Sequence, residues 1–206
     1  MQSERHRAGY LKHRKGVNDF FTSLIRQSAD SPYIGLTKWL NSEGGKICIP
    51  SMGLLIRPDG YGEFSISESE IVPFFFEYDR GTQKLDIVNS KLERYIVAAE
   101  SKAVLRKLGL HFFPKVLMMT TSETRALNIK YIFKRYLKEN NPRMENLKSL
   151  FMISWEDPAH MENLLGRIWY KFGVSLEKSS FLGEKNPICE DVIKIEGNTH
   201  GLQSAL

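Results

Sequence analysis

A chain of 206 residues, 42% hydrophobic and 26% charged, can bury one sizeable core and has the composition of a soluble globular protein. Its longest apolar runs are strand-sized, which excludes a membrane-spanning helix, and no apolar segment follows the basic N-terminus, which argues against a secretory signal. The formal net charge of +5 favours polyanionic partners, although many basic proteins bind no nucleic acid.

The two cysteines, Cys48 and Cys189, are widely separated in the sequence. This spacing fits reduced thiols better than a disulfide framework or a zinc site, so we expect a cytoplasmic protein with no membrane partner. The basic residues cluster in residues 5–15 and again in 130–138. Taken alone, each cluster is more typical of a solvated surface than of a binding site.

The N-terminal part is predicted to contain a helix, followed by a segment that fits either a strand or a short helix. Apolar residues recur at helical spacing over residues 11–27, after an irregular lead-in at 1–10. The helix should end before Pro32, because the residue preceding a proline avoids helical backbone angles. Residues 34–41 fit either a strand or a short helix.

A region of strands follows. Short apolar runs occupy residues 47–49 and 52–56, and the alternation of residue types over 61–66 predicts a half-buried strand. The chain then turns and returns as a strongly apolar run at 71–78, which we predict to be a central strand of the sheet.

The second half alternates between helical and strand patterns. A long helical stretch is predicted from residue 82 to about 108, and a buried strand at 116–120. Further elements are predicted at 126–138 (a helix), 147–155 (a third buried strand) and 161–169 (a helix or a loop over the sheet). This order predicts an α/β fold with a single mixed β-sheet flanked by helices.

The domain prediction is simple. We expect one domain over residues 1–182, because no repeat or low-complexity segment divides them. The polar composition of residues 183–206 predicts a loosely ordered C-terminal tail.

Acidic side chains gather where two predicted strands meet. Asp59 precedes one strand and Glu77 ends the next, so pairing of the two strands as a hairpin would bring these carboxylates together. Asp79 leaves the same face as Glu77, because side chains alternate along a strand. Magnesium prefers carboxylate ligands, so these three acids are candidate metal ligands.

A helix face follows the second of these strands. Lys91 and Tyr95 are four residues apart and therefore share that face, where a cation would stabilise charge on a phosphorane. Simpler interpretations exist, since Pro58-Asp59-Gly60 is a common turn and Asp79 could cap a helix. The combination favours a functional site, because an apolar strand should not end in two acids unless they are paired.

Six segments within roughly residues 11–182 carry a resemblance to a known family: LKHRKGVNDFFTSL (11–24), RPDGY (57–61), FFEYDRGT (75–82), KLERY (91–95), FPKVLMMT (113–120) and LLGRIW (164–169). They resemble the plasmid replication-relaxation proteins of Gram-positive plasmids and integrative elements. Members often carry an N-terminal winged-helix region before the histidine-containing helix. This chain begins almost at that helix, so the resemblance implies a short member.

The same residues look like a restriction-endonuclease-like PD-(D/E)xK core. Pro58-Asp59 matches the first half of the motif, Glu77-Tyr78-Asp79 matches the E-x-K position, and Lys91-x-x-x-Tyr95 is similar to a Q-x-x-x-Y helix motif. Asp79 stands where the motif has lysine. Either Lys91 supplies the missing positive charge from the helix, or the core binds DNA without cleaving it.

The resemblance implies a DNA-binding protein of a plasmid or integrative element that acts in plasmid replication and DNA relaxation. In an active, DNA-nicking form, Asp59 and Glu77 would bind magnesium with Asp79 assisting, and Lys91 would stabilise the phosphorane. The phosphate would be oriented by four further side chains, His13, Arg57, Arg80 and Tyr95.

Two alternatives are left open by the sequence. One is a catalytically inactive DNA-binding scaffold that recruits other plasmid replication or conjugative-transfer proteins. The other is an enzyme with a tyrosine nucleophile, Tyr61 or Tyr95, which would form a covalent adduct with DNA.

Overall fold

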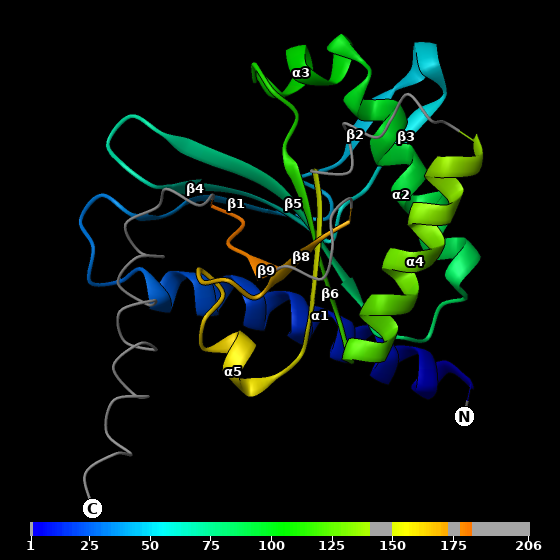
Figure 1. The fold of residues 1–206 in the computed structure, drawn as a ribbon, viewed down its shortest axis with the longest axis horizontal. Coiled ribbons are helices and arrows are strands. Elements are labelled where there is room, and N and C mark those ends of the chain that lie inside the picture. The colour runs from blue at the N-terminus through cyan, green and yellow to red at the C-terminus, as the bar shows by residue number, and fades with distance from the viewer. Residues whose placement is uncertain (1, 141–149, 173–177, 183–206) are drawn as a thin grey trace, which may run out of the picture.

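The computed structural model describes residues 2–140, 150–172 and 178–182, in which helices cover both faces of a mixed sheet (Figure 1). The helices are α1 (Gln2–Gln27), α2 (Leu85–Ala99), α3 (Lys102–Leu108), α4 (Glu123–Asn140) and α5 (Pro158–Met161). The strands of the sheet are β1 (Gly35–Asn41), β4 (Gly60–Ser65), β5 (Ile71–Asp79), β6 (Lys115–Thr120), β7 (Phe151–Trp155), β8 (Trp169–Lys171) and β9 (Lys178–Ser179). A separate hairpin, β2 (Ile47–Ile49) and β3 (Leu54–Ile56), encloses the short 3₁₀ turn η1 (Pro50–Met52).

The sheet has the strand order β1-β4-β5-β6-β7-β8-β9 within the described residues. Its first three strands, β1, β4 and β5, pair with one another in antiparallel orientation. The strands β6 and β7 then pair in parallel next to β5, and β8 and β9 extend the sheet beyond β7 with antiparallel pairing. The predicted α/β fold with a mixed sheet flanked by helices is confirmed. The predicted hairpin is confirmed as well, with Gly60 opposite Phe76.

The strand β5 separates two apolar layers, because its side chains alternate between the faces of the sheet. Phe74 and Phe76 lie against α1, where Phe20 stacks on Phe76 with ring centroids 3.8 Å apart. Phe75 lies in the opposite layer under α2, with its ring centroid 5.3 Å from that of Tyr95. Burial on both faces explains why the sequence of β5 is almost continuously apolar.

Several boundaries differ from the sequence-based predictions. The helix α1 is described from Gln2, so the prediction of an irregular lead-in was wrong for residues 2–10; no proline precedes the core-facing part of α1 to stop the helix. The single helix predicted from residue 82 to about 108 is instead a short loop at 82–84 and two helices, because Ser101 leaves the helical conformation and its side chain caps α3.

The remaining differences concern the N-terminal edge strand and the C-terminal part of the chain. The segment 34–41, predicted as either a strand or a short helix, contains the strand β1 from Gly35 to Asn41. The strand β7 is described from Phe151, while 147–149 and the predicted tail 183–206 lie outside the described residues. Most of the segment 161–169, which was predicted as a helix or a loop over the sheet, is a loop: residues 162–168 connect the end of α5 to β8. No helix in the described ranges is both long and apolar enough to cross a lipid bilayer.

Candidate functional site

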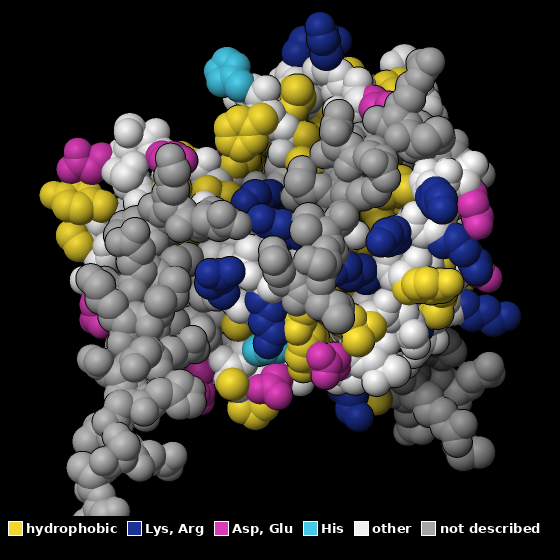
Figure 2. All heavy atoms as spheres, in the orientation of Figure 1, with side chains coloured by type: hydrophobic (Ala, Val, Ile, Leu, Met, Phe, Trp, Pro, Cys, Tyr) yellow, Lys and Arg dark blue, Asp and Glu magenta, His cyan; other side chains and the backbone are white. Residues whose placement is uncertain are grey.

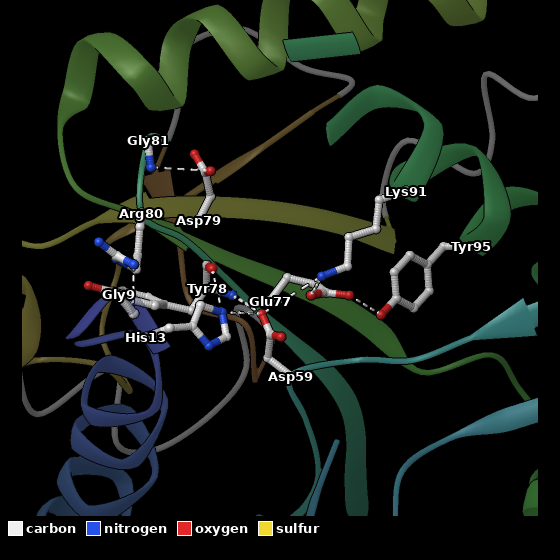
Figure 3. Close-up of polar contacts among 10 residues, drawn as sticks. All are labelled: Gly9, His13, Asp59, Glu77, Tyr78, Asp79, Arg80, Gly81, Lys91 and Tyr95. Carbon is white, nitrogen blue, oxygen red and sulfur yellow. Dashed lines mark hydrogen bonds and ion pairs between the residues drawn. The ribbon is translucent and has the colours of Figure 1, made fainter. Parts of the chain in front are cut away.

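The candidate site lies where β4 begins and β5 ends. The backbone N–H of Asp59 donates to the Phe76 carbonyl across 3.0 Å, which places Asp59 immediately before β4. Glu77 is the next residue of β5 and is 1% exposed. Since neighbouring antiparallel strands hold these acids at the same end of the hairpin, their carboxylates face one shared space (Figure 3).

Lys91 of α2 places its ammonium group between the two acids. Its Nζ is 3.8 Å from Asp59 Oδ2 and forms an ion pair with Glu77 Oε2. One helical turn later, the Tyr95 hydroxyl donates to the other oxygen of Glu77. The structure therefore brings Asp59, Glu77, Lys91 and Tyr95 together, as the spacing of the sequence predicted.

His13 reaches the same group from α1 on the opposite face of the sheet. Its Nε2 lies 3.2 Å from Asp59 Oδ2 and 3.1 Å from the Tyr78 carbonyl oxygen, so a proton on Nε2 can be donated to both. The approach depends on Gly16, one turn along α1, where an added Cβ would overlap the Tyr78 ring. Asp59 also accepts from the Tyr78 backbone N–H across 2.9 Å.

The protonation of Asp59, Glu77 and His13 depends on how deeply each side chain is buried and on the charged side chains beside it. Burial raises the pKa of the Glu77 carboxyl to about 8, against the opposing effect of the Lys91 charge. Burial also acts to raise the pKa of Asp59, but the hydrogen bond from His13 and the Lys91 charge outweigh it and lower this pKa. The hydrogen bond to Asp59 raises the pKa of His13 above 6.5. Asp59 is thus the acid that loses its proton more readily, and Glu77 is the one that retains it.

Asp79 has a different set of partners. Arg125 of α4 donates to it through Nε across 2.8 Å, the Thr120 hydroxyl donates across 3.0 Å, and the Gly81 N–H donates across 3.2 Å. Figure 3 shows Asp79 turned away from the Lys91 group. The contacts favour a structural role, and the role of metal ligand predicted for Asp79 stays a prediction.

Sequence reasoning did not identify Arg125 as part of this region. Local periodicity gave no signal for it, because the contact depends on the parallel pairing of β6 with β5, which sets Thr120 beside Asp79. Arg125 then follows in the first turn of α4. From this position its side chain can reach back to the carboxyl ends of the parallel strands.

The two arginines predicted to contact DNA lie on opposite sides of the site. Arg80 donates through Nη1 to the Gly9 carbonyl across 2.6 Å, and this bond fixes the N-terminal half of α1 to the end of β5. Arg57 is exposed and pairs with Glu43. Neither arginine contacts Asp59 or Glu77 in the hydrogen bonds and ion pairs of the described residues.

Two of the described tyrosines were candidates for a nucleophile. Tyr61 is 2% exposed and donates to Glu63, and Tyr95 is 1% exposed and donates to Glu77. Burial raises the pKa of both hydroxyls. These surroundings disfavour a covalent mechanism at either tyrosine, because a nucleophile needs access to the phosphorus and an activated hydroxyl.

An open cavity of about 500 Å³ gives solvent access to the group. It is lined from α1 by His13, from the hairpin by Asp59 and Arg80, and from α2 by Lys91. The cavity therefore presents both cationic and anionic side chains to a ligand. Glu77 lies behind Lys91, at the buried side of the group.

A magnesium ion fits this site in part. Asp59 and Glu77 converge on one cation position, which the Lys91 ammonium occupies, and magnesium is commonly held by one or two carboxylates with waters and substrate phosphates. Within the described ranges, no three or more His, Cys, Asp or Glu side chains are grouped so as to hold a metal ion. The fit therefore rests on two carboxylates and requires the ammonium of Lys91 to move.

Comparison with known proteins places these residues in a family context. A family model described as replication-relaxation matches residues 2–113, more than half of the chain. The matched segment contains His13, the β4–β5 hairpin and Lys91, and it ends before Arg125. Searches of curated proteins and of solved structures found no match.

Proposed function

The chain belongs to the replication-relaxation family, and from this premise we propose that it binds DNA and nicks it during plasmid replication and relaxation. The family description connects the chain with replication and relaxation, and the nicking site proposed is the group formed by Asp59, Glu77 and Lys91. We propose magnesium as its cofactor, held by the two carboxylates.

The observation that carries this proposal is the position of the Lys91 ammonium between two carboxylates of neighbouring strands. The PD-(D/E)xK motif needs a lysine next to its acids, and in this chain that position along β5 is taken by Asp79. Lys91 supplies a positive charge at the carboxylates from α2 instead. This supports the resemblance to endonuclease-like cores without requiring a lysine on the strand.

Each side chain of the group has a role consistent with its surroundings. Lys91 would bind a non-bridging phosphate oxygen and stabilise the charge that develops on it. His13, whose pKa is raised by Asp59, can donate a proton to a phosphate oxygen from the opposite wall of the cavity. Tyr95 holds Glu77 in place. Bound magnesium would supply Lewis-acid polarisation of the phosphate at Asp59 and Glu77.

The charge distribution supports a polyanionic substrate. Figure 2 shows Lys and Arg side chains gathered over the region of β8 and β9, on the face seen in Figure 1. Lys178 belongs to this region and lies 5.6 Å from the ring centroids of both Trp155 and Tyr170. A basic surface of this kind attracts DNA phosphates and makes binding depend steeply on salt.

The direct test is nicking of supercoiled plasmid with magnesium or manganese. Asp59→Ala and Glu77→Ala should abolish nicking while DNA affinity, measured by fluorescence anisotropy, is largely kept. Glu139→Ala is the matched control, because Glu139 is an exposed acid at the end of α4 and should nick like wild type. If nicking survives both site substitutions, the site assignment is wrong.

A second function is favoured by one observation. Each acid of the site is already paired with a protein cation, and Asp79 is held by Arg125. This pairing fits a catalytically inactive core that binds DNA and recruits other replication or transfer proteins. It predicts DNA binding with a steep salt dependence and no cleavage with any divalent metal.

A further inference from the structure

A second, larger cavity of about 650 Å³ adjoins the candidate site. The two cavities share Tyr10, His13 and Asp59 in their walls, so they form neighbouring compartments on either side of the His13–Asp59 contact. The second cavity extends along α1 to the β1 strand and the loop after it. His13, Asp59 and Arg57 line it, but no substrate group has been assigned to this space.

The wall of the second cavity offers an aromatic surface. Trp39 of β1 lines it with 37% of its surface exposed, and one face of its indole stacks on Phe21 with centroids 4.6 Å apart and planes 13° from parallel. Phe21 is completely buried in the α1 layer. The indole is therefore held in a fixed orientation by the core and remains accessible at the cavity.

Polar groups complete the wall around this aromatic surface. The Asn41 amide oxygen accepts from the backbone N–H groups of Glu43 and Gly44, which orients its NH₂ group as a donor for a ligand. Arg57 stands at the rim, exposed and paired with Glu43. Arg14 lies on the α1 side, with its guanidinium 5.7 Å from the Tyr10 ring centroid. The aromatic surface can stack on a nucleobase, the amide can donate a hydrogen bond to the edge of that base, and the guanidinium groups can bind the phosphates of the nucleotide.

We propose that the second cavity holds one unpaired nucleotide of a single-stranded or locally melted DNA substrate, with its base stacked on Trp39. The inference rests on the proposed function, since the phosphate next to this nucleotide would lie at Lys91 and His13. The volume is within the range of small-ligand pockets. A base inside a duplex is stacked on both sides and offers no free face to an indole, so the base must be unpaired.

The test compares binding of a labelled single strand with binding of the matching duplex by fluorescence anisotropy. Trp39→Ala should weaken single-strand binding roughly 5- to 100-fold, as removal of a base-stacking aromatic does, and change duplex binding by less than about twofold. Trp39→Phe keeps an aromatic ring on Phe21 and should restore most of the single-strand affinity. Tyr131→Ala is the control, because Tyr131 is 66% exposed on α4, away from the cavity.

A photo-crosslink keeps the test independent of folding defects in the alanine variant. Single-stranded DNA that contains 5-iodouracil should crosslink to the wild-type protein at the peptide containing Trp39. Equal losses for single strand and duplex in Trp39→Ala, or no crosslink at Trp39, would overturn the inference, whereas nicking of supercoiled plasmid by wild type would keep the proposed function. If wild type binds neither form of DNA, the proposed function fails and the inference fails with it.

Discussion

Arg125 on α4 and the buried Asp79 at the end of β5 form a partly buried ion pair, with Nε 2.8 Å from Oδ2 and the two side chains 17% and 5% exposed. A second nitrogen of Arg125 donates to the Gln83 carbonyl across 2.6 Å. One arginine thus ties the end of β5 and the loop before α2 to α4. Since that loop leads to Lys91, the pair positions the helix that carries the cation of the candidate site.

Arg125→Met is expected to destabilise the fold by about 3 kcal/mol, because it leaves the Asp79 carboxylate buried without its cation. Urea unfolding measures this change. Arg135→Met is the matched control on the same helix, since Arg135 is 60% exposed and its loss should cost less than about 0.5 kcal/mol. Equal effects of the two substitutions would contradict the structural role assigned to Arg125.

Glu77 predicts a pH dependence of stability. Its pKa is about 8 in the folded protein against 4.5 for a free side chain, so the folded state binds the proton more tightly. The contribution of Glu77 to stability should therefore be fully present below about pH 4.5 and be lost as the pH rises through about 8. The slope from this group approaches about 1.4 kcal/mol per pH unit.

Glu77→Gln should flatten this slope, because the amide keeps an acceptor for Tyr95 and does not ionise. Unfolding free energies across the same pH range measure the effect in both proteins. The exposed Glu70→Gln serves as control and should leave the wild-type slope unchanged. A slope that persists in Glu77→Gln would mean that another group titrates in this range.

The sequence predicted the hairpin, the convergence of Asp59 and Glu77, and the helix face of Lys91 because each depends on local periodicity. Strand alternation and helical spacing need no knowledge of the tertiary fold. The partner of Asp79 could not be predicted in this way, since Arg125 is brought to it by the parallel pairing of β5 with β6. The adjacent cavity likewise depends on how α1 packs across β1, which periodicity does not define.

Gly16 is expected to control the contact between His13 and Asp59. In Gly16→Ala the added methyl group overlaps the Tyr78 ring, which is fixed by donating its hydroxyl to Glu156 across 2.5 Å, so α1 must move outward. His13 then loses the hydrogen bond that raises its pKa, and this pKa should fall toward 6.5. NMR titration of the His13 ring measures the change.

Lys12→Ala is the control for this titration, because Lys12 is an exposed residue of the same helix and should leave the pKa of His13 raised. Overpacking of a well-packed contact typically costs about 1–3 kcal/mol, so Gly16→Ala should also lower stability within that range. An unchanged His13 pKa in a destabilised Gly16→Ala protein would show that the Tyr78 ring moves instead of α1.

Lys91→Ala should bind divalent cations more tightly than wild type does. Its ammonium occupies the position between Asp59 and Glu77, and its removal opens that position to a metal ion, which would displace the proton that Glu77 otherwise holds. A divalent ion that binds only the folded protein raises its unfolding temperature. Magnesium, manganese or calcium should therefore stabilise Lys91→Ala more than wild type in thermal unfolding, and Lys91→Arg, which keeps the positive charge, should respond like wild type. Adding Asp59→Asn to Lys91→Ala should cancel the gain, and an equal response of all these proteins would show that the two carboxylates do not form a metal site.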